Sequence, residues 1–170
     1  MYTLKDILRE RERRIEHQEK LLEQYKMPIL VIRVNYPGAN KDNYISQGIT
    51  AIMEQAICEM LSSSIHYKIM KTTAEGPTVI MSINKDARDI KSMTLNIEHN
   101  HILGRCVDLD VYDEKGKSIS REDFGLDMRK CYICSDIAHN CVRSKKHSKE
   151  EVEGFIKSRF EEYMKKLSGK

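Results

Sequence analysis

"LGRCVDLDVYDEKGK", residues 103–117, alternates apolar and acidic side chains and then ends in turn-forming residues. The apolar residues between Val107 and Val111 fall on one side of an extended chain, and Asp108 and Asp110 fall on the other, because successive side chains of a strand point to opposite faces. The stretch therefore predicts a β-strand with one apolar face. An ordinary half-exposed strand with a solvated acidic face accounts for the same alternation.

The two carboxylates give this strand a chemical interpretation as well as a structural one. Asp108 and Asp110 repel each other unless solvent or a cation screens their charges. A hard divalent ion such as Mg²⁺ binds to one or two carboxylates together with substrate phosphates. The pair therefore indicates a candidate Mg²⁺ site for phosphate chemistry.

The rest of the chain predicts an α+β domain that spans residues 1–170. Amphipathic periodicity indicates helices, and β-branched apolar runs indicate strands. The expected helices cover residues 4–25, 42–61, 84–101 and 148–167, and the other expected strands cover residues 29–34, 66–72 and 78–83. Residues 118–147 show no strong period. This order of elements favours a mixed or mostly antiparallel sheet flanked by helices, with a cysteine-rich segment before the last helix.

Capping residues predict where three of these helices begin. Thr3 with Asp6, and Ser148 with Glu151, have the spacing of a capping box. Asn84 is expected to cap the third helix, since asparagine is a preferred residue at this position.

Composition places the chain among ordinary globular domains. The 170 residues are 32% charged and 40% hydrophobic, and the net charge is +3. We expect no membrane span, because no apolar run is long enough, and the opening residues show no signal-peptide core. A cytoplasmic protein is the default expectation, and five cysteines in a reducing compartment favour metal binding or free thiols over disulfides.

A cluster of cysteines and histidines follows the acidic strand. Cys131 and Cys134 form a C-x-x-C pair, and Cys141 and His147 follow closely, with His139 as a competing ligand. Three sulfurs and one imidazole are the donor set of a closed tetrahedral zinc site. Free thiols or a redox pair are the alternatives. Basic residues surround the cluster and make it suited to phosphate or to an acidic protein: Arg129, Lys130, Arg143, Lys145 and Lys146.

Three stretches of the sequence together resemble one known family. They are "NYPGANK" (35–41), "EHNHILGRCVDLDV" (98–111) and "GLDMRKCYICSDIAHNCVRSKKHS" (125–148). They resemble the apo-citrate lyase phosphoribosyl-dephospho-CoA transferases, also called citrate lyase holo-acyl-carrier-protein synthases. The resemblance covers nearly the whole chain and is most specific over residues 98–148. Cys106 departs from the family pattern, because an aliphatic residue is usual there.

The resemblance implies a specific reaction. Members of this family transfer a phosphoribosyl-dephospho-CoA group from its triphosphate precursor to a serine of the acyl-carrier (gamma) subunit of citrate lyase, and pyrophosphate leaves. Such nucleotidyl-type transfer needs a divalent cation, which agrees with the Mg²⁺ interpretation of the aspartates. A fold like that of nucleotidyltransferases is a further expectation, and no nucleic acid is expected as a partner.

The resemblance also implies roles for individual residues. Asp108 and Asp110 become the Mg²⁺ ligands, and either carboxylate could help to deprotonate the carrier serine. Arg105 is expected to contact phosphate through its planar donor fork. His101 and Glu98 are weaker candidates, because His101 could simply cap the preceding helix and Glu98 could simply pair with Arg105. The remaining residues expected to bind substrate are Asn35, Gly38, Lys41, Gly104, Arg129 and Arg143.

Two other classes of function stay open at this point. One is a zinc-bearing binding module that grips RNA or an acidic partner, although the chain lacks the interleaved aromatics of base-stacking surfaces. The other is a nucleotidyltransferase that acts on RNA. Such enzymes usually place a Gly-Ser turn about a dozen residues before their paired aspartates, whereas Gly104 lies much closer to Asp108 and no serine follows it.

Overall fold

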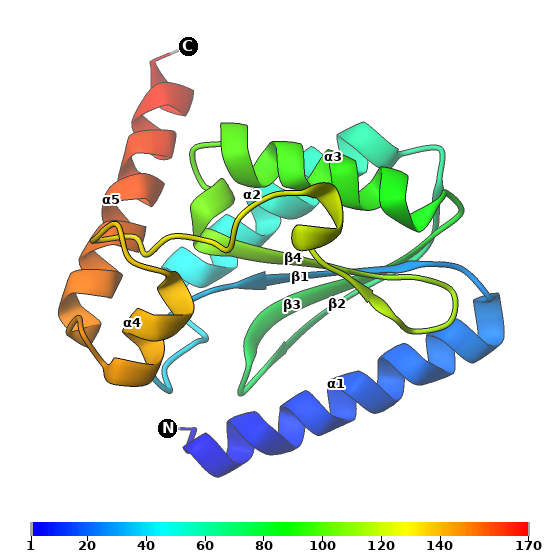
Figure 1. Ribbon diagram of the computed structural model, residues 1–170, viewed down its shortest axis with the longest axis horizontal. Coiled ribbons are helices and arrows are strands. Elements are labelled where there is room, and N and C mark those ends of the chain that lie inside the picture. Colours follow the sequence, from blue (N-terminus) through cyan, green and yellow to red (C-terminus); the bar gives the residue numbers. More distant parts are fainter. Residues whose placement is uncertain (1, 170) are drawn as a thin grey trace.

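The computed structural model describes residues 2–169, which form an antiparallel sheet with helices on both faces (Figure 1). Within these residues the sheet has five strands in the order β2-β3-β1-β4-β5, and each neighbouring pair is antiparallel. The strands are β1 (Ile29–Val34), β2 (Ile65–Thr73), β3 (Gly76–Ile83), β4 (Val107–Tyr112) and β5 (Ser118–Ile119). The predicted α+β class and the mostly antiparallel sheet are confirmed.

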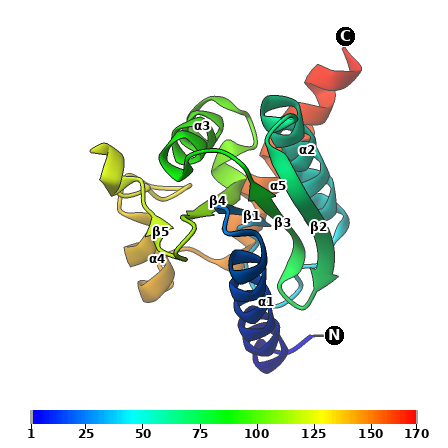
Figure 2. The same cartoon turned by 90° about the vertical axis from the view of Figure 1, so that its right-hand side faces the viewer.

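The helices divide unequally between the two faces of the sheet. They are α1 (Leu4–Tyr25), α2 (Tyr44–Leu61), α3 (Ala87–Asn100), α4 (Ala138–Ser144) and α5 (Lys149–Ser168). The helix α1 runs along one face, whereas α2 and α3 cover the other face (Figures 1 and 2). The helices α4 and α5 lie at the end of the sheet where β1 finishes. In the described part of the chain, no helix combines the length and apolar character that a membrane crossing requires.

The strand β1 is buried on both sides, which explains its nearly uninterrupted apolar sequence. Leu30 and Ile32 belong to the main core with α2, α3 and α5, whereas Ile29 and Val31 pack in a smaller cluster with Leu21 of α1. Two layers of apolar contact therefore fix the sheet between α1 and the other helices.

The strand β4 shows the predicted alternation. Val107, Leu109 and Val111 are fully buried in the main core. Asp108 and Asp110 point to the opposite face, and each keeps a third of its side chain exposed. The paired carboxylates thus lie on the same face of the sheet as α1.

Most predicted element boundaries agree with the structure, and one predicted cap is wrong. The capping boxes of Thr3 with Asp6 and of Ser148 with Glu151 are present. The third helix is capped by Asp86 and not by Asn84, because the Asp86 carboxylate accepts hydrogen bonds from the first turn of α3. The backbone N–H of Asn84 instead donates to Ser64 O at 2.8 Å, which holds this residue outside the helix.

Candidate active site

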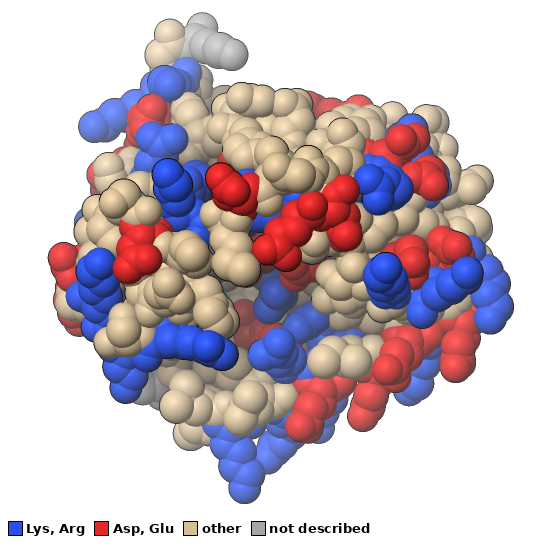
Figure 3. Space-filling view, viewed as in Figure 1, with Lys and Arg blue, Asp and Glu red and all other residues tan. Residues whose placement is uncertain are grey.

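A cavity of about 680 Å³ lies at the end of the sheet beside α4 and α5. Five of the predicted substrate-binding or catalytic residues line it, namely Asn35, Gly38, Lys41, Arg105 and Arg129, together with Cys131, Cys141 and His147 of the cysteine cluster. Its volume falls in the ordinary range of small-molecule sites, which is about 300–1,000 Å³. The face drawn in Figure 3 is hollowed near its centre, and both basic and acidic side chains surround the hollow.

The loop after β1 forms one wall of this cavity. Gly38 has a φ of 74°, which favours glycine, and the backbone N–H of Asn35 donates to Cys106 O at 2.9 Å. The Lys41 ammonium folds back and donates to Tyr36 O at 2.5 Å. Burial and the neighbouring Arg33 guanidinium lower the pKa of Lys41. The wall therefore carries a partly desolvated cation, the Lys41 ammonium. An anionic ligand beside it would stabilise its charged form.

Two arginines hold the aspartate pair from opposite sides. Arg33 lies in β1, next to β4, and its guanidinium is 2.7 Å from Asp110 and 4.0 Å from Asp108. Arg129 comes from the cysteine-rich segment and lies 3.1 Å from Asp108. The two carboxylates are therefore neutralised by side chains from distant parts of the sequence.

Sequence reasoning missed Arg33. Its sequence signal was a single charged residue in the otherwise apolar strand ILVIRV. The antiparallel register places Arg33 directly opposite Asp108 across β1 and β4. A lone arginine in a buried strand needs an anionic partner, so this position could have been linked to the acidic strand.

The carboxyl group of Asp108 has an altered affinity for protons. Burial raises its pKa, although Arg129 and Arg33 act in the opposite direction. A carboxylate with a raised pKa is better suited to accept a proton during catalysis. Asp108 and Asp110 offer carboxylate oxygens of the kind that bind Mg²⁺, but each is already paired with an arginine, so the Mg²⁺ site stays a prediction.

The sequence analysis allowed for a pairing of Glu98 with Arg105, but in the structure these two side chains have other partners. The Glu98 side chain is nearly buried in the last turns of α3 and lies 2.5 Å from Arg129. Arg105 instead donates from its guanidinium to Lys130 O and lies over the Tyr132 ring. The helix α3 thus presents Glu98 to Arg129, and Glu98 orients the arginine that contacts Asp108.

Tyr132 is a second residue of the cavity that sequence reasoning missed. Its ring stacks on Phe155 of α5 with 4.8 Å between centroids. Within the described residues, its buried hydroxyl and the buried Nε of Arg105 have no hydrogen-bond partner. Burial and the Asp108 carboxylate raise the pKa of Tyr132, so the hydroxyl keeps its proton. Both residues line the cavity, and each keeps one buried donor without a partner among the described residues.

Six of the predicted site residues do not line this cavity, namely Asp108, Asp110, His101, Gly104, Cys134 and Arg143. His101 caps the end of α3, and its Nδ1 accepts from the Leu103 N–H at 3.1 Å. A Cβ on Gly104 would collide with carbonyl oxygens of α3, which gives this glycine a packing role. Arg143 is exposed in the last turn of α4, and Lys145 lines the cavity in its place.

The predicted zinc ligands lie close together. One ligand atom from each of Cys131, Cys134, Cys141 and His147 falls within 4.8 Å of the others. The sulfurs of Cys134 and Cys141 are 3.6 Å apart, and His147 Nε2 is 3.3 Å from the Cys134 sulfur. Tetrahedral zinc with Zn–S bonds of about 2.3 Å requires S···S distances of about 3.8 Å, so the group fits this ion. His139 is exposed and does not belong to the group.

The fold and the cavity together define a class of protein. It is an α+β protein whose cation-lined cavity borders a pair of carboxylates, an arrangement typical of enzymes that act on phosphorylated substrates. The family model of the apo-citrate lyase phosphoribosyl-dephospho-CoA transferases matches residues 2–163. The chain belongs to this family of transferases.

Individual relatives agree with this assignment. A protein of Escherichia coli O7:K1 is 33% identical over 150 residues, which cover 85% of this chain and 81% of the relative. One of Citrobacter koseri is 30% identical over 155 residues, with 88% and 84% covered, and one of Shigella boydii serotype 18 is 32% identical over 150 residues, with 85% and 81% covered. All three are named apo-citrate lyase phosphoribosyl-dephospho-CoA transferase.

Proposed function

We propose that this chain transfers a phosphoribosyl-dephospho-CoA group to apo-citrate lyase. The donor is the triphosphate precursor, the acceptor is a serine of the acyl-carrier (gamma) subunit, and pyrophosphate is released. The single structural observation that carries this proposal is the cavity that gathers Lys41, Arg105 and Arg129 beside Asp108. Family membership supplies the identity of the transferred group.

The donor phosphates bind among the cations of the cavity. Lys41 is partly desolvated, and Arg105 has an Nε–H without a partner, so both gain from an anionic ligand. The hydroxyl of Tyr132 is positioned as a further donor to phosphate oxygen. Asn35 and Gly38 contribute the wall along which the phosphate chain lies.

The transfer itself joins the serine oxygen to the phosphorus next to the ribose. As this P–O bond forms, the bond to the departing pyrophosphate breaks, and the serine proton moves to a carboxylate of the Asp108 and Asp110 pair or to solvent. Asp108 and Asp110 would hold Mg²⁺, which neutralises phosphate charge when it is bound. Arg33 and Arg129 keep the two carboxylates in place.

The cysteine cluster supports this site from behind. Zinc bound to Cys131, Cys134, Cys141 and His147 would fix a segment that has little regular structure of its own. Arg129 and Tyr132 flank the first of these ligands in sequence. Arg143 is exposed and does not line the cavity, which suits contact with the acceptor protein better than contact with the donor.

Intact-mass analysis tests the proposal. The apo acyl-carrier subunit is incubated with this protein, the triphosphate donor and Mg²⁺, and its mass should rise by one phosphoribosyl-dephospho-CoA phosphodiester. A carrier with alanine at the acceptor serine should stay unmodified. An unchanged wild-type carrier, together with nucleotide addition to RNA in a parallel reaction, would instead favour the RNA-directed nucleotidyltransferase.

A further inference from the structure

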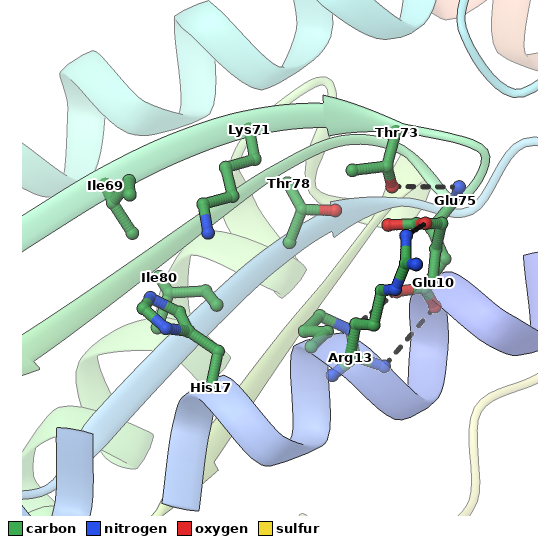
Figure 4. Close-up of a pocket in the computed structure, with 10 residues that line it drawn as sticks. Glu10, Arg13, His17, Ile69, Lys71, Thr73, Glu75, Thr78 and Ile80 are labelled. Atoms are coloured by element: carbon green, nitrogen blue, oxygen red, sulfur yellow. Dashed lines mark hydrogen bonds and ion pairs between the residues drawn. The ribbon is translucent and has the colours of Figure 1, made fainter. Parts of the chain in front are cut away.

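A second, smaller cavity lies between α1 and the hairpin of β2 and β3 (Figure 4). Its volume is about 140 Å³, well below that of a nucleotide-sized site. It is on the face of the sheet that also carries Arg33 and Asp108, because Thr78 pairs with Arg33 and Arg33 pairs with Asp108 in the sheet register. None of the predicted site residues lines it.

The carboxylates at this cavity are already engaged by arginines. Glu75 lies 2.8 Å from Arg14, and both side chains are more than 90% buried. Glu10 holds Arg13 at 2.6 Å. These acids therefore offer little to a cation that enters the cavity.

Three other polar groups of the cavity have no partner among the described residues. Lys71 makes no ion pair, and His17 Nε2 and Thr78 Oγ1 are buried without a hydrogen bond. Thr78 is only 6% exposed. Figure 4 shows Lys71 and His17 reaching into the space from opposite walls, β2 and α1. Lys71 is exposed, so its lack of a partner is ordinary, whereas buried polar atoms without partners are rare in folded proteins. His17 Nε2 and Thr78 Oγ1 are therefore the two atoms that indicate a ligand.

The chemistry of these groups selects an anion. An ammonium offers only donors, and a hydroxyl and an imidazole can both donate. Burial lowers the pKa of His17, and the charges of Lys71 and Lys20 act in the same direction. The imidazole is therefore held in its neutral form, and the positive charge of the cavity comes from Lys71, because Glu10 and Glu75 are paired with Arg13 and Arg14.

We propose that this cavity is an oxyanion site that takes a phosphate or diphosphate group, held by Lys71, Thr78 and His17. Its role rests on the proposed function, in which pyrophosphate leaves from beside Asp108. Thr78 and Asp108 are two strands apart, which is about 9–10 Å across the sheet, and Arg33 lies between them. The site thus receives either the terminal phosphates of the bound donor or free pyrophosphate.

Titration calorimetry with inorganic pyrophosphate tests the site without donor or carrier. The wild type should bind pyrophosphate saturably, and Lys71→Met should weaken the binding about tenfold or more, as expected for loss of one charge-assisted hydrogen bond. Thr78→Val should weaken it without removing a charge. Lys68→Met is the matched control, because Lys68 lies in the same strand on the opposite face and pairs with Glu54. Its affinity should equal that of the wild type.

Histidine NMR gives a second readout and separates the two sources of phosphate. Pyrophosphate should raise the pKa of His17, because a nearby anion favours the imidazolium. If the donor's terminal phosphates occupy the site, the donor displaces pyrophosphate; if free pyrophosphate is the ligand, the two bind together. No saturable binding, or binding that Arg105→Ala abolishes while Lys71→Met leaves it intact, would overturn the proposal. Neither result would change the mass increase expected for the carrier, so this inference and the proposed function can fail separately.

Discussion

At the scale of single residues, Asp108 of β4 carries a cost to folding that its proposed role in the reaction would explain. Asp108 is partly buried, and burial raises its pKa, so its ionised form is unfavourable in the folded state. Because the folded-state pKa is the higher one, this penalty on folding is present at neutral pH and disappears as the pH falls from the folded to the unfolded pKa. Burial of the Asp108 carboxylate therefore lowers the free energy of unfolding at neutral pH, and it keeps this carboxylate beside the cavity.

Asp108→Asn should separate these two effects. We expect the transfer rate to fall about a hundredfold or more, the order typical for loss of a group that stabilises transition-state charge. The melting temperature should stay the same or rise, because Arg129 keeps Glu98 and Arg33 keeps Asp110. Rate assays and thermal unfolding on the same preparation measure both. Asp110→Asn is the comparison, since it removes the closest partner of Arg33, and should lower both values. Wild-type transfer by both variants would place the chemistry elsewhere.

Arg105→Lys tests whether the arginine fork matters beyond its charge. Lysine keeps the charge but cannot stack over Tyr132 or offer two parallel donors. The Michaelis constant for the donor should rise about tenfold to a hundredfold, since one hydrogen bond to a charged group contributes about 1.5–3 kcal/mol. Steady-state kinetics with varied donor measures the change. Arg143→Lys provides a control outside the cavity, and a fully active Arg105→Lys would make Arg105 only a surface charge.

At the scale of elements, the free edge of β4 explains how Arg129 is placed. The strand β5 pairs only with Val111 and Tyr112, so the first half of β4 would leave carbonyl oxygens unpaired. Arg129 donates to Val107 O and Lys91 donates to Leu109 O, both at 2.9 Å. The helix α3 and the cysteine-rich segment thus each supply one donor to this edge, and the same contact places Arg129 beside Asp108.

Removal of zinc should loosen this segment before it affects the rest of the fold. Metal analysis of the purified protein should find about one zinc per chain. A strong chelator should then lower the melting temperature by about 5 °C or more, which is roughly 2 kcal/mol for a chain of this size. Cys134→Ser should have the same effect, whereas Cys58→Ser should not, because Cys58 lies in α2 outside the group. If the purified protein contains no zinc and keeps its full stability, the predicted zinc site is wrong.

At the scale of the whole molecule, the two faces of the sheet differ in polarity. The face toward α2, α3 and α5 is filled by the main apolar core. The face toward α1 carries a polar row that crosses four strands, from Lys71 and Thr78 through Arg33 to Asp108. This row runs from the small cavity under α1 toward the carboxylates beside the large one, so the register of the sheet connects the two binding spaces.

The local sequence of this chain determined its elements and its ligand types. Apolar periodicity and capping residues predicted α1, α2, α3, α5 and the strands β1 to β4, because these signals depend on neighbours a few positions apart. They did not predict β5 and α4, which lie within residues 118–147, where no strong period was found. The close spacing of Cys131, Cys134, Cys141 and His147 likewise predicted that their ligand atoms lie close enough together to hold a metal ion. The predicted cap at Asn84 failed because Ser64, a residue of another connection, binds its backbone.

Only the tertiary structure decided which distant side chains meet at the site. Arg33 and Asp110 are 77 positions apart, and their contact depends on the register of β1 against β4. Apolar alternation fixes the face that each residue occupies but leaves open a shift by two residues along the strand. The pairing of Glu98 with Arg129 and the approach of Tyr132 to Asp108 likewise require the cysteine-rich segment to dock against β4. Periodicity records which face of an element is apolar, whereas the partner of each polar group depends on how the elements pack in space.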